Sequence, residues 1–322
     1  MTGATGFLGG ALVRRLGKRG AKVTASGRNR AAGEALTTLG VRFKAAELSD
    51  AGAVAALCRG QDVVIHAGAL SLPWGRPKQF HTSNALGTEH VVEGCLKHGV
   101  KRLVYISSPS VYQTFGPQLN VSERVRLPEP INHYAASKLA GERAVRRAEA
   151  LPHIILRPRA LFGPGDRTIV PRLLARLEKG GLPVIGDEQT VTDLTYVSNA
   201  VDAVLLCLDA PDSVWDETYN ISNGEPVKVW KLIRELARRL DLPPPRGHLP
   251  KTTAMRLAGA LEQLYQWLPG YPEPPLTRYA VNVLSSSFTL DISKARDKLG
   301  YRPRVSVADG LTRYLSWYQE QP

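Results

Sequence analysis

The residues best suited to proton transfer are a tyrosine and a lysine four positions apart, Tyr134 and Lys138, in the segment YAASK. Residues at this spacing share one face of a helix. An ammonium group one turn from a phenol favours the phenolate and lowers the phenol pKa from its usual value near about 10. The pair therefore predicts a general acid/base, Tyr134, whose pKa Lys138 adjusts.

A cluster of serines precedes this pair. The strand predicted at 102–107 ends in the sequence SSPS, which contains Ser107 and Ser108. Strand ends at the carboxyl edge of a parallel sheet face the cleft in which ligands bind. The hydroxyl group of a serine at this strand end can therefore bind the same substrate oxygen as Tyr134. We expect one of these serines to act together with Tyr134 and Lys138.

The chain opens on a glycine-rich turn that suits a pyrophosphate. Gly3, Gly6 and Gly9 have the spacing TGxxGxxG, and a helical pattern at 11–16 follows at once. Glycines at these places permit a tight turn, close approach of the backbone to the pyrophosphate, and packing of helix on strand. The positive end of the following helix faces the anion. The turn predicts a dinucleotide cofactor.

The identity of that cofactor depends on the residues after the second predicted strand, at 22–26. A carboxylate at this point would accept a hydrogen bond from the 2′-hydroxyl group of NAD. Here Arg28 and Arg30 follow instead, and guanidinium groups suit the 2′-phosphate of NADP. We expect NADP(H). NAD stays possible, because two solvated arginines would also fit this pattern.

Strand-like and helical runs alternate over the first half of the chain, which predicts a parallel sheet covered by helices on both faces, a doubly wound α/β (Rossmann) fold. After about Gly163 proline and glycine become frequent and helices dominate. We expect a dinucleotide-binding domain at 1–162 and a smaller, mainly helical substrate lobe at 163–322, with some segments returning to the first domain. The predicted strands are 22–26, 41–44, 62–66, 102–107 and 153–157, and the predicted helices are 11–16, 31–39, 80–98, 134–150, 229–240 and 252–268.

The strand that normally leads into such a glycine turn is missing, since only Met1 and Thr2 precede Gly3. In this fold that strand is central, and an empty slot would expose backbone donors and acceptors on both neighbours. We therefore expect the natural chain to start several residues upstream. Otherwise another segment must fill the slot, or the strands at 22–26 and 62–66 must close it.

Composition narrows the class of protein. The net charge of +13 is spread along the 322 residues without a basic run, so nucleic-acid binding is not expected. The three cysteines are far apart, which indicates reduced thiols in a cytoplasmic protein, and no histidine has the spacing of a metal ligand. No apolar run is long enough to span a bilayer.

Taken together, the motifs resemble the extended short-chain dehydrogenase/reductase superfamily over nearly the whole chain. TGATGFLGG resembles its cofactor turn, QDVVIHAGA its fourth strand, NALGT its N-x-x-G-T helix, and LRPRALFGPGD the strand and turn after its catalytic helix. The resemblance implies the catalytic roles given above, and the S-x-x-V-Y register selects Ser108 over Ser107. It also implies that the following residues bind the cofactor: Gly3, Thr5, Gly6, Phe7, Leu8, Gly9, Arg28, Glu47, Leu48, Ala67, Gly68, Ala69, Ser107, Tyr134, Lys138 and Pro158.

C-terminal patterns such as PLTRY, TLDISKA and LGYRP resemble the 3β-hydroxysteroid dehydrogenase branch, which includes sterol 4-carboxylate 3-dehydrogenases and 2-alkyl-3-oxoalkanoate reductases. Ala160 stands where sugar-nucleotide epimerases and dehydratases usually carry asparagine. The resemblance implies an oxidoreductase that interconverts a 3-hydroxy and a 3-oxo group on an apolar small molecule, a sterol or a β-keto lipid acid. The rivals are a sugar-nucleotide epimerase or dehydratase and a non-catalytic cofactor-sensing protein.

Four residues are candidates for contact with substrate: Trp74, Asn84, Ala160 and Met255. Met255 belongs to an apolar stripe on the helix predicted at 252–268. Such a stripe usually packs into a core; the alternatives are an apolar wall for a lipid-like substrate or contact with a membrane surface, which is not favoured. We also expect a homodimer.

Overall fold

A parallel sheet forms the centre of the molecule in the computed structural model, which describes residues 1–180 and 182–321. Its strands pair in the order β11 (Glu217–Ile221), β6 (His153–Pro158), β4 (Arg102–Ile106) and β3 (Val63–His66). A second parallel pair, β1 (Thr24–Gly27) and β2 (Arg42–Ala45), lies beyond β3. β4 and β6 are buried along almost their whole length, as strands covered on both faces must be.

The backbone of residues 1–4 lies between β1 and β3 and forms hydrogen bonds with both. The N–H of Thr2 donates to the carbonyl of Ile65 (3.0 Å), and the N–H of Ser26 donates to the carbonyl of Met1 (2.8 Å). The sheet therefore continues from β3 through residues 1–4 to β1 and β2. The slot predicted to be empty is occupied at its carboxyl end by the glycine turn itself, and β1 and β3 do not pair directly.

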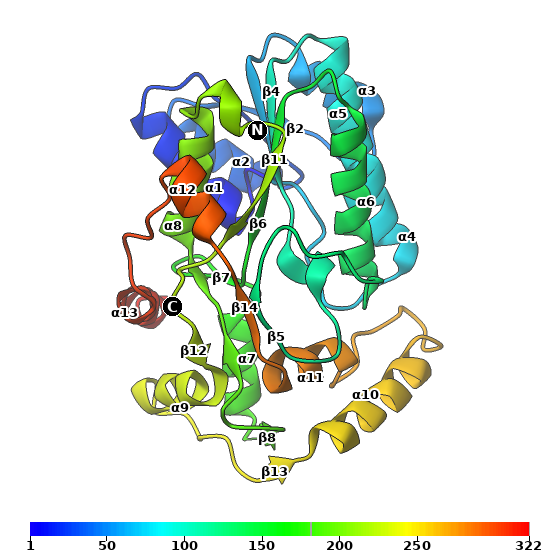
Figure 1. Cartoon of the computed structure of the whole chain (residues 1–322), viewed down its shortest axis with the longest axis vertical. Coiled ribbons are helices and arrows are strands. Elements are labelled where there is room, and N and C mark those ends of the chain that lie inside the picture. The colour runs from blue at the N-terminus through cyan, green and yellow to red at the C-terminus, as the bar shows by residue number, and fades with distance from the viewer. Residues whose placement is uncertain (181, 322) are drawn as a thin grey trace.

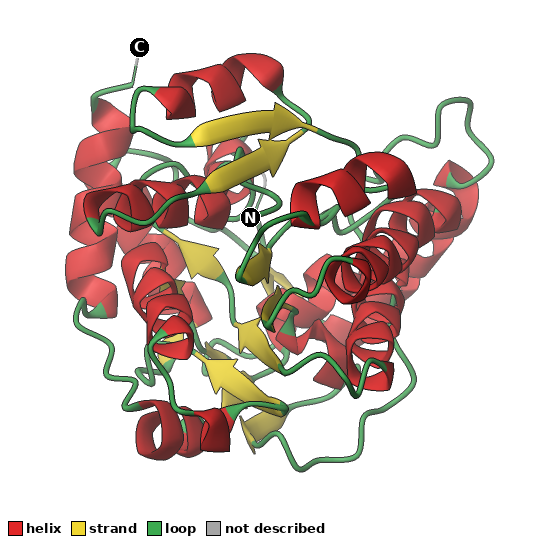
Figure 2. Ribbon diagram, turned by 90° about the horizontal axis from the view of Figure 1, so that it is seen from above, coloured by secondary structure: helices red, strands yellow, loops and turns green. Residues whose placement is uncertain are grey.

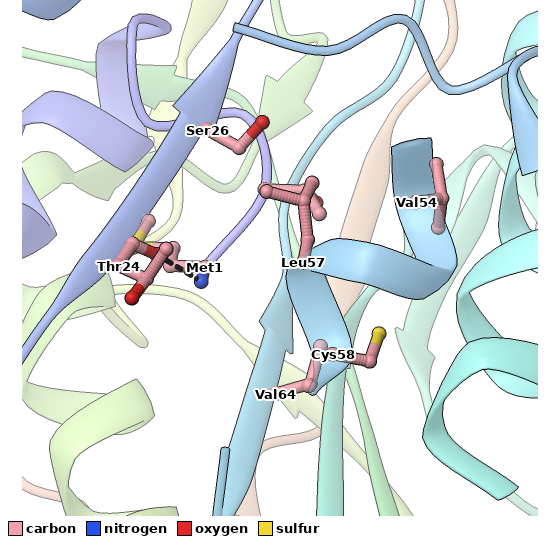
Figure 3. Close-up of a pocket in the computed structure, with 8 residues that line it drawn as sticks. Met1, Thr24, Ser26, Val54, Leu57, Cys58 and Val64 are labelled. Atoms are coloured by element: carbon pink, nitrogen blue, oxygen red, sulfur yellow. Dashed lines mark hydrogen bonds between the residues drawn. The ribbon is translucent and has the colours of Figure 1, made fainter. Parts of the chain in front are cut away.

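A small cavity of about 10 Å³ remains beside Met1, below this short bridge. Figure 3 shows Met1, Thr24 and Ser26 on one side and Leu57, Cys58 and Val64 on the other. The Met1 ammonium group donates to the carbonyl of Thr24 at 2.7 Å, and burial lowers its pKa to about 6. The cavity is about large enough for one water molecule, since α3 (Ala51–Cys58) closes over the gap.

Helices cover both faces of the sheet, as expected of a doubly wound fold (Figures 1 and 2). On one face, α1 (Phe7–Lys18), α8 (Val197–Leu208) and α12 (Ser293–Leu299) share a core with the strands. On the other face lie α3, α5 (Gly87–Lys97) and α6 (His133–Arg147). α2 (Arg30–Thr37) packs on β1 and β2.

The long helix predicted at 80–98 is a continuous run of three elements. It begins with α4 (Pro77–Phe80), widens into a π-helical segment, η1 (His81–Leu86), and ends as α5. The other predicted strands and helices of the first half are present with ends shifted by a few residues. α3 and α8 were not predicted.

The rest of the chain builds a second core, in which α7 (Val170–Glu178), α9 (Val229–Arg239), α10 (Lys251–Tyr265), α11 (Arg278–Ser285) and α13 (Val307–Gln319) predominate. A small sheet joins β12 (Val227–Lys228), β9 (Val191–Thr192), β14 (Phe288–Leu290) and β5 (Gln118–Val121). The remaining short elements are β7 (Leu161–Phe162), β8 (Val184–Ile185), β10 (Thr195–Tyr196), β13 (His248–Leu249), η2 (Pro109–Tyr112) and η3 (Asp212–Val214).

The two halves of the sequence are interleaved. α8, β11 and α12 follow residue 163 but return to the first core, where β11 pairs with β6. Among the described helices, none is long and apolar enough to cross a membrane.

Candidate active site

A cleft with a volume of about 650 Å³ opens beside the glycine turn. This size is typical of a ligand site. The residues that line it include Gly3, Thr5, Gly6, Arg28, Glu47, Leu48, Ala67, Gly68 and Ala69, all of them predicted to bind the cofactor. The cleft thus gathers the residues that follow β1, β2 and β3 with the glycine turn.

The glycine turn and α1 approach each other backbone to backbone. Gly3 has φ +67°, and a Cβ there would lie 2.6 Å from the carbonyl carbon of Ala67. A Cβ on Gly9 would lie 1.9 Å from the Gly3 oxygen. The N-cap of α1, Gly6, offers no side chain to the first N–H groups of the helix, and its first turn carries no acidic residue. These N–H groups suit an anion such as a pyrophosphate.

Seven predicted cofactor residues are not among those that line this cleft: Phe7, Leu8, Gly9, Ser107, Tyr134, Lys138 and Pro158. Leu8 and Gly9 are buried beneath the turn, where they shape it. Phe7 lies beside the turn after β7, because its ring would be 3.6 Å from a Cβ on Gly165. Arg28 follows β1 directly, is exposed and has no acidic residue next to it in sequence.

The acid/base candidate Tyr134 stands in the first turn of α6, which Asn132 caps by accepting the N–H of Ala135 at 2.7 Å. Burial raises the pKa of Tyr134, while hydrogen bonds with Ser71 and Ser108 act to lower it. The structure therefore brings Tyr134 and Ser108 together as predicted. It adds Ser71, whose position in a loop gave no sequence signal.

Lys138 lies one turn further along α6 and is almost completely buried. Its Nζ donates to the carbonyl of Ile106 at 2.7 Å and lies 4.3 Å from the centroid of the Tyr105 ring. Burial lowers the pKa of Lys138 to about 7. Desolvation is the largest effect on the pKa of the Tyr134 phenol here, and the lowering of that pKa by Lys138 stays a prediction.

The same helix face continues to Glu142, which fixes α6 to the sheet. Its carboxylate is fully buried and accepts hydrogen bonds from Ser107 Oγ (2.6 Å) and from Nε (2.7 Å) of Arg157 on β6. Burial opposes the charge, but the Arg157 guanidinium group holds the pKa of Glu142 below its usual value. Ser107, which is predicted to bind the cofactor, follows β4 and joins that strand to this ion pair.

Asn84, predicted to touch substrate, serves as a clamp. Its side chain is buried in η1. Its Oδ1 accepts the N–H of Leu70 at 2.6 Å, and its Nδ2 donates to the carbonyl of Leu70 and to Ser137 Oγ. These bonds tie the segment after β3, and hence Ser71, to α6.

A buried histidine lies behind this clamp. His66 Nδ1 is 2.6 Å from Thr2 Oγ1, and Nε2 is 3.1 Å from Thr88 Oγ1. Because the Thr88 hydroxyl group donates to the carbonyl of Asn84, Nε2 must carry the hydrogen. Burial lowers the pKa of His66 to about 3, so the ring is neutral and joins the glycine turn to Thr88 at the start of α5.

The other substrate candidates lie on the side of the second core. Trp74 follows Ser71 in the same loop, and its ring stacks on Tyr271 at 5.1 Å between centroids. Ala160 follows β6 with φ +41°. Met255 packs against the second core, which supports core packing for the stripe on α10. Tyr279 of α11 was not predicted; it is close enough to Tyr134 for its charge state to affect the pKa of Tyr134.

Comparisons with known proteins agree with this geometry. The model of the NAD dependent epimerase/dehydratase family matches residues 1–222. A 2-alkyl-3-oxoalkanoate reductase of Stenotrophomonas maltophilia is 36% identical over 97% of this chain and 97% of its own. A decarboxylating sterol-4-alpha-carboxylate 3-dehydrogenase of Schizosaccharomyces pombe is 33% identical over 79% of this chain and 77% of its own.

A solved structure with the same architecture is the dTDP-glucose 4,6-dehydratase DesIV from Streptomyces venezuelae, described with bound NAD. It is 26% identical, with a TM-score of 0.75, and the match covers 99% of this chain and 96% of that one. The cleft beside the glycine turn is accordingly a nicotinamide-dinucleotide site. The chain belongs to the NAD dependent epimerase/dehydratase family.

Proposed function

We propose that this protein is an NADP(H)-dependent oxidoreductase that interconverts a 3-hydroxy and a 3-oxo group on an apolar substrate, a sterol or a β-keto lipid acid. The observation that carries the proposal is the phenol of Tyr134, which interacts with Ser108 and Ser71 and stands on a helix that is fixed to the sheet. The names of the curated relatives, an oxoalkanoate reductase and a sterol carboxylate dehydrogenase, support the substrate class.

Each residue of the site has one task in this reaction. When bound, the nicotinamide ring supplies or accepts the hydride. Ser108 orients the substrate oxygen, and Tyr134 donates a proton to that oxygen in reduction or takes one from it in oxidation. Lys138, whose pKa of about 7 allows it to exchange a proton near neutrality, would hold the ribose. Pro158, at the end of β6, would border the nicotinamide.

Arg28 supports NADP over NAD. Arg28 lines the cleft at the end of β1, where a cofactor with a 2′-phosphate would carry extra negative charge. A bidentate guanidinium–phosphate pair is stronger than the contact that a neutral hydroxyl group offers. Thr5, Glu47 and Leu48 complete the lining near this end.

A sugar-nucleotide epimerase or dehydratase is the rival, because solved relatives include such enzymes. The side chain of Ala160 cannot donate a hydrogen bond to a sugar nucleotide. The bacterial oxoalkanoate reductase and the yeast sterol dehydrogenase, which are both more similar in sequence to this chain than DesIV is, instead bear oxidoreductase names.

The test is a substrate panel with the purified protein. Oxidation of 3-hydroxy fatty acids and 3β-hydroxysteroids with NADP⁺ or NAD⁺ is followed through reduced-cofactor absorbance, and binding of UDP- and dTDP-sugars is measured by calorimetry. We expect turnover of at least one hydroxylated lipid and weak binding of the sugar nucleotides. Tight binding of a sugar nucleotide without turnover of any lipid would move the protein to the rival class.

A further inference from the structure

We propose that Arg159 binds a carboxylate on the substrate, so that the site selects a 3-hydroxy or 3-oxo acid over the corresponding neutral lipid. The inference rests on the proposed function and names the chemical group that determines specificity.

The position of Arg159 follows from the alternation of side chains along β6. Arg157 and Arg159 are two residues apart on extended backbone and therefore point to the same face. On that face Arg157 meets Glu142 of α6. Tyr134 lies two turns before Glu142 on the same side of α6.

The direction of the helix places Arg159 toward Tyr134. α6 connects the parallel strands β4 and β6, and such a crossover helix runs antiparallel to both. Passing along β6 from Arg157 to Arg159 therefore leads toward the first turn of α6, where Tyr134 stands.

The guanidinium group of Arg159 is buried with donors to spare. The residue is 6% exposed. Its Nη2 donates to Thr192 Oγ1 at 3.1 Å, and its guanidinium carbon lies 4.6 Å from the centroid of the Phe288 ring. Its Nε is buried without a hydrogen-bond partner in the described residues, although a guanidinium group has five N–H donors.

No carboxylate in residues 1–180 and 182–321 lies within ion-pair distance of Arg159, in contrast to Arg157. Burial lowers the Arg159 pKa, and the nearby charge of Asp193 only partly opposes this effect. One oxygen of Asp193, however, accepts the N–H of Leu290 at 2.7 Å, and burial raises the Asp193 pKa. A buried guanidinium group without a close anion favours an anionic ligand.

Tyr279 links this group to the acid/base. Its phenol is close enough to both Tyr134 and Arg159 to affect the pKa of each. In a 3-hydroxy acid the carboxylate is separated from the carbinol carbon by one methylene or branched carbon. A substrate oxygen at Tyr134 would thus leave the carboxylate close to the reacting group, on the side that Arg159 occupies.

The experiment compares 3-hydroxydodecanoate with its methyl ester, which has the same chain and hydroxyl group without the charge. For the wild type we expect kcat/KM with NADP⁺ to be at least about 10-fold higher for the acid. In Arg159→Met the value for the acid should fall about 100-fold, the loss expected for one hydrogen-bonded charge pair, while the ester changes less than about 3-fold. Arg159→Lys keeps the positive charge but loses the planar arrangement of N–H donors, so its kcat/KM for the acid should lie between those of the wild type and Arg159→Met.

Two controls separate this result from damage to the fold or to the proposed function. Arg143→Met, at an exposed position on α6, should leave both substrates unchanged, and calorimetric NADPH binding should persist in Arg159→Met. Equal kcat/KM for acid and ester in the wild type, or equal losses for both in Arg159→Met, would overturn the role of Arg159 while leaving the function standing. Turnover of neither compound nor of any steroid would instead reject the proposed function. If Arg159→Met fails to fold, the wild-type ratio and Arg159→Lys decide.

Discussion

Tyr134 has a phenol whose pKa is raised by burial, so it keeps its proton at neutral pH and is suited to donate it. Tyr134→Phe removes the hydroxyl group and leaves the ring beside Phe80. We expect kcat to fall about 100- to 10,000-fold, the usual contribution of positioned proton transfer, with NADPH affinity nearly unchanged. Steady-state kinetics and calorimetry measure the two effects, and Tyr265→Phe is the matched control. More than about a tenth of wild-type activity in Tyr134→Phe would show that another group moves the proton.

Arg28 is the residue on which cofactor choice depends. Arg28→Asp places a carboxylate where the 2′-phosphate of NADP would lie and offers an acceptor to the 2′-hydroxyl group of NAD. We expect the NADPH-to-NADH affinity ratio to fall about 100-fold. Titration calorimetry with both cofactors measures it, and Arg59→Asp gives the same change of charge on an exposed turn. Equal affinity of the wild type for both cofactors contradicts the preference.

Among individual residues, the sequence predicts those that belong to short motifs with a fixed spacing. The glycine turn, Ser108 and the Tyr134–Lys138 pair are recognisable because each motif is short. Glu142, Arg159 and Tyr279 are not, since their partners are distant in sequence: Arg157 meets Glu142 across β6 and α6. The raised pKa of Tyr134 was also beyond prediction, because burial depends on the whole fold.

The helix α1 packs so closely against the glycine turn that no side chain fits at Gly9, between them. A Cβ on Gly9 would lie 1.9 Å from the Gly3 oxygen, whereas on Gly10 its nearest neighbours lie at 3.6 Å. Gly9→Ala should therefore lower stability by about 1–3 kcal/mol and abolish NADPH binding. Gly10→Ala should be neutral or stabilising by up to about 1 kcal/mol, because alanine favours a helix. Urea unfolding and calorimetry compare the pair, and similar behaviour of the two variants would refute close packing at Gly9.

The predicted strands and helices of the first half match the structure because their hydrophobic periods are clear. The interior of the long helix differs from the prediction, because η1 is π-helical. The hydrophobic pattern of its residues gives no indication of this wider helical turn. In the second half, β14 pairs with β5 across more than half the chain, and such short strands depend on tertiary pairing. The slot beside β3 is a similar case, since residues 1–4 form bonds on both sides without being a full strand.

For the whole molecule, the neutral His66 predicts a loss of stability in acid. Burial lowers its pKa from 6.5 to about 3, so the unfolded chain binds more protons than the folded one between these values. The contribution of the neutral His66 ring to the free energy of unfolding is complete above about pH 6.5 and is lost progressively as the pH falls toward 3. At pH 5 the loss is about 2 kcal/mol.

His66→Gln keeps a donor and an acceptor but does not titrate. The difference in free energy of unfolding between pH 7.5 and pH 5.0 should therefore be about 2 kcal/mol smaller in this variant than in the wild type. Urea unfolding at both pH values measures it. The exposed His81→Gln variant should keep the wild-type difference, and an unchanged difference in His66→Gln would mean that another group causes the acid sensitivity.

Tyr279 reaches the site from α11, and this origin has a consequence for protein engineering. α11 is joined to α10 by the Arg278–Glu262 ion pair (2.7 Å), and the two helices form a hairpin at the edge of the molecule (Figure 1). The cofactor turn, Ser108, Tyr134 and Lys138 all come from the first 138 residues of the chain. Replacing residues 250–287 with those of a relative should therefore change which substrate is preferred and leave the cofactor and proton-transfer residues unaltered. This helical hairpin is thus a suitable segment to exchange when substrate preference is redesigned.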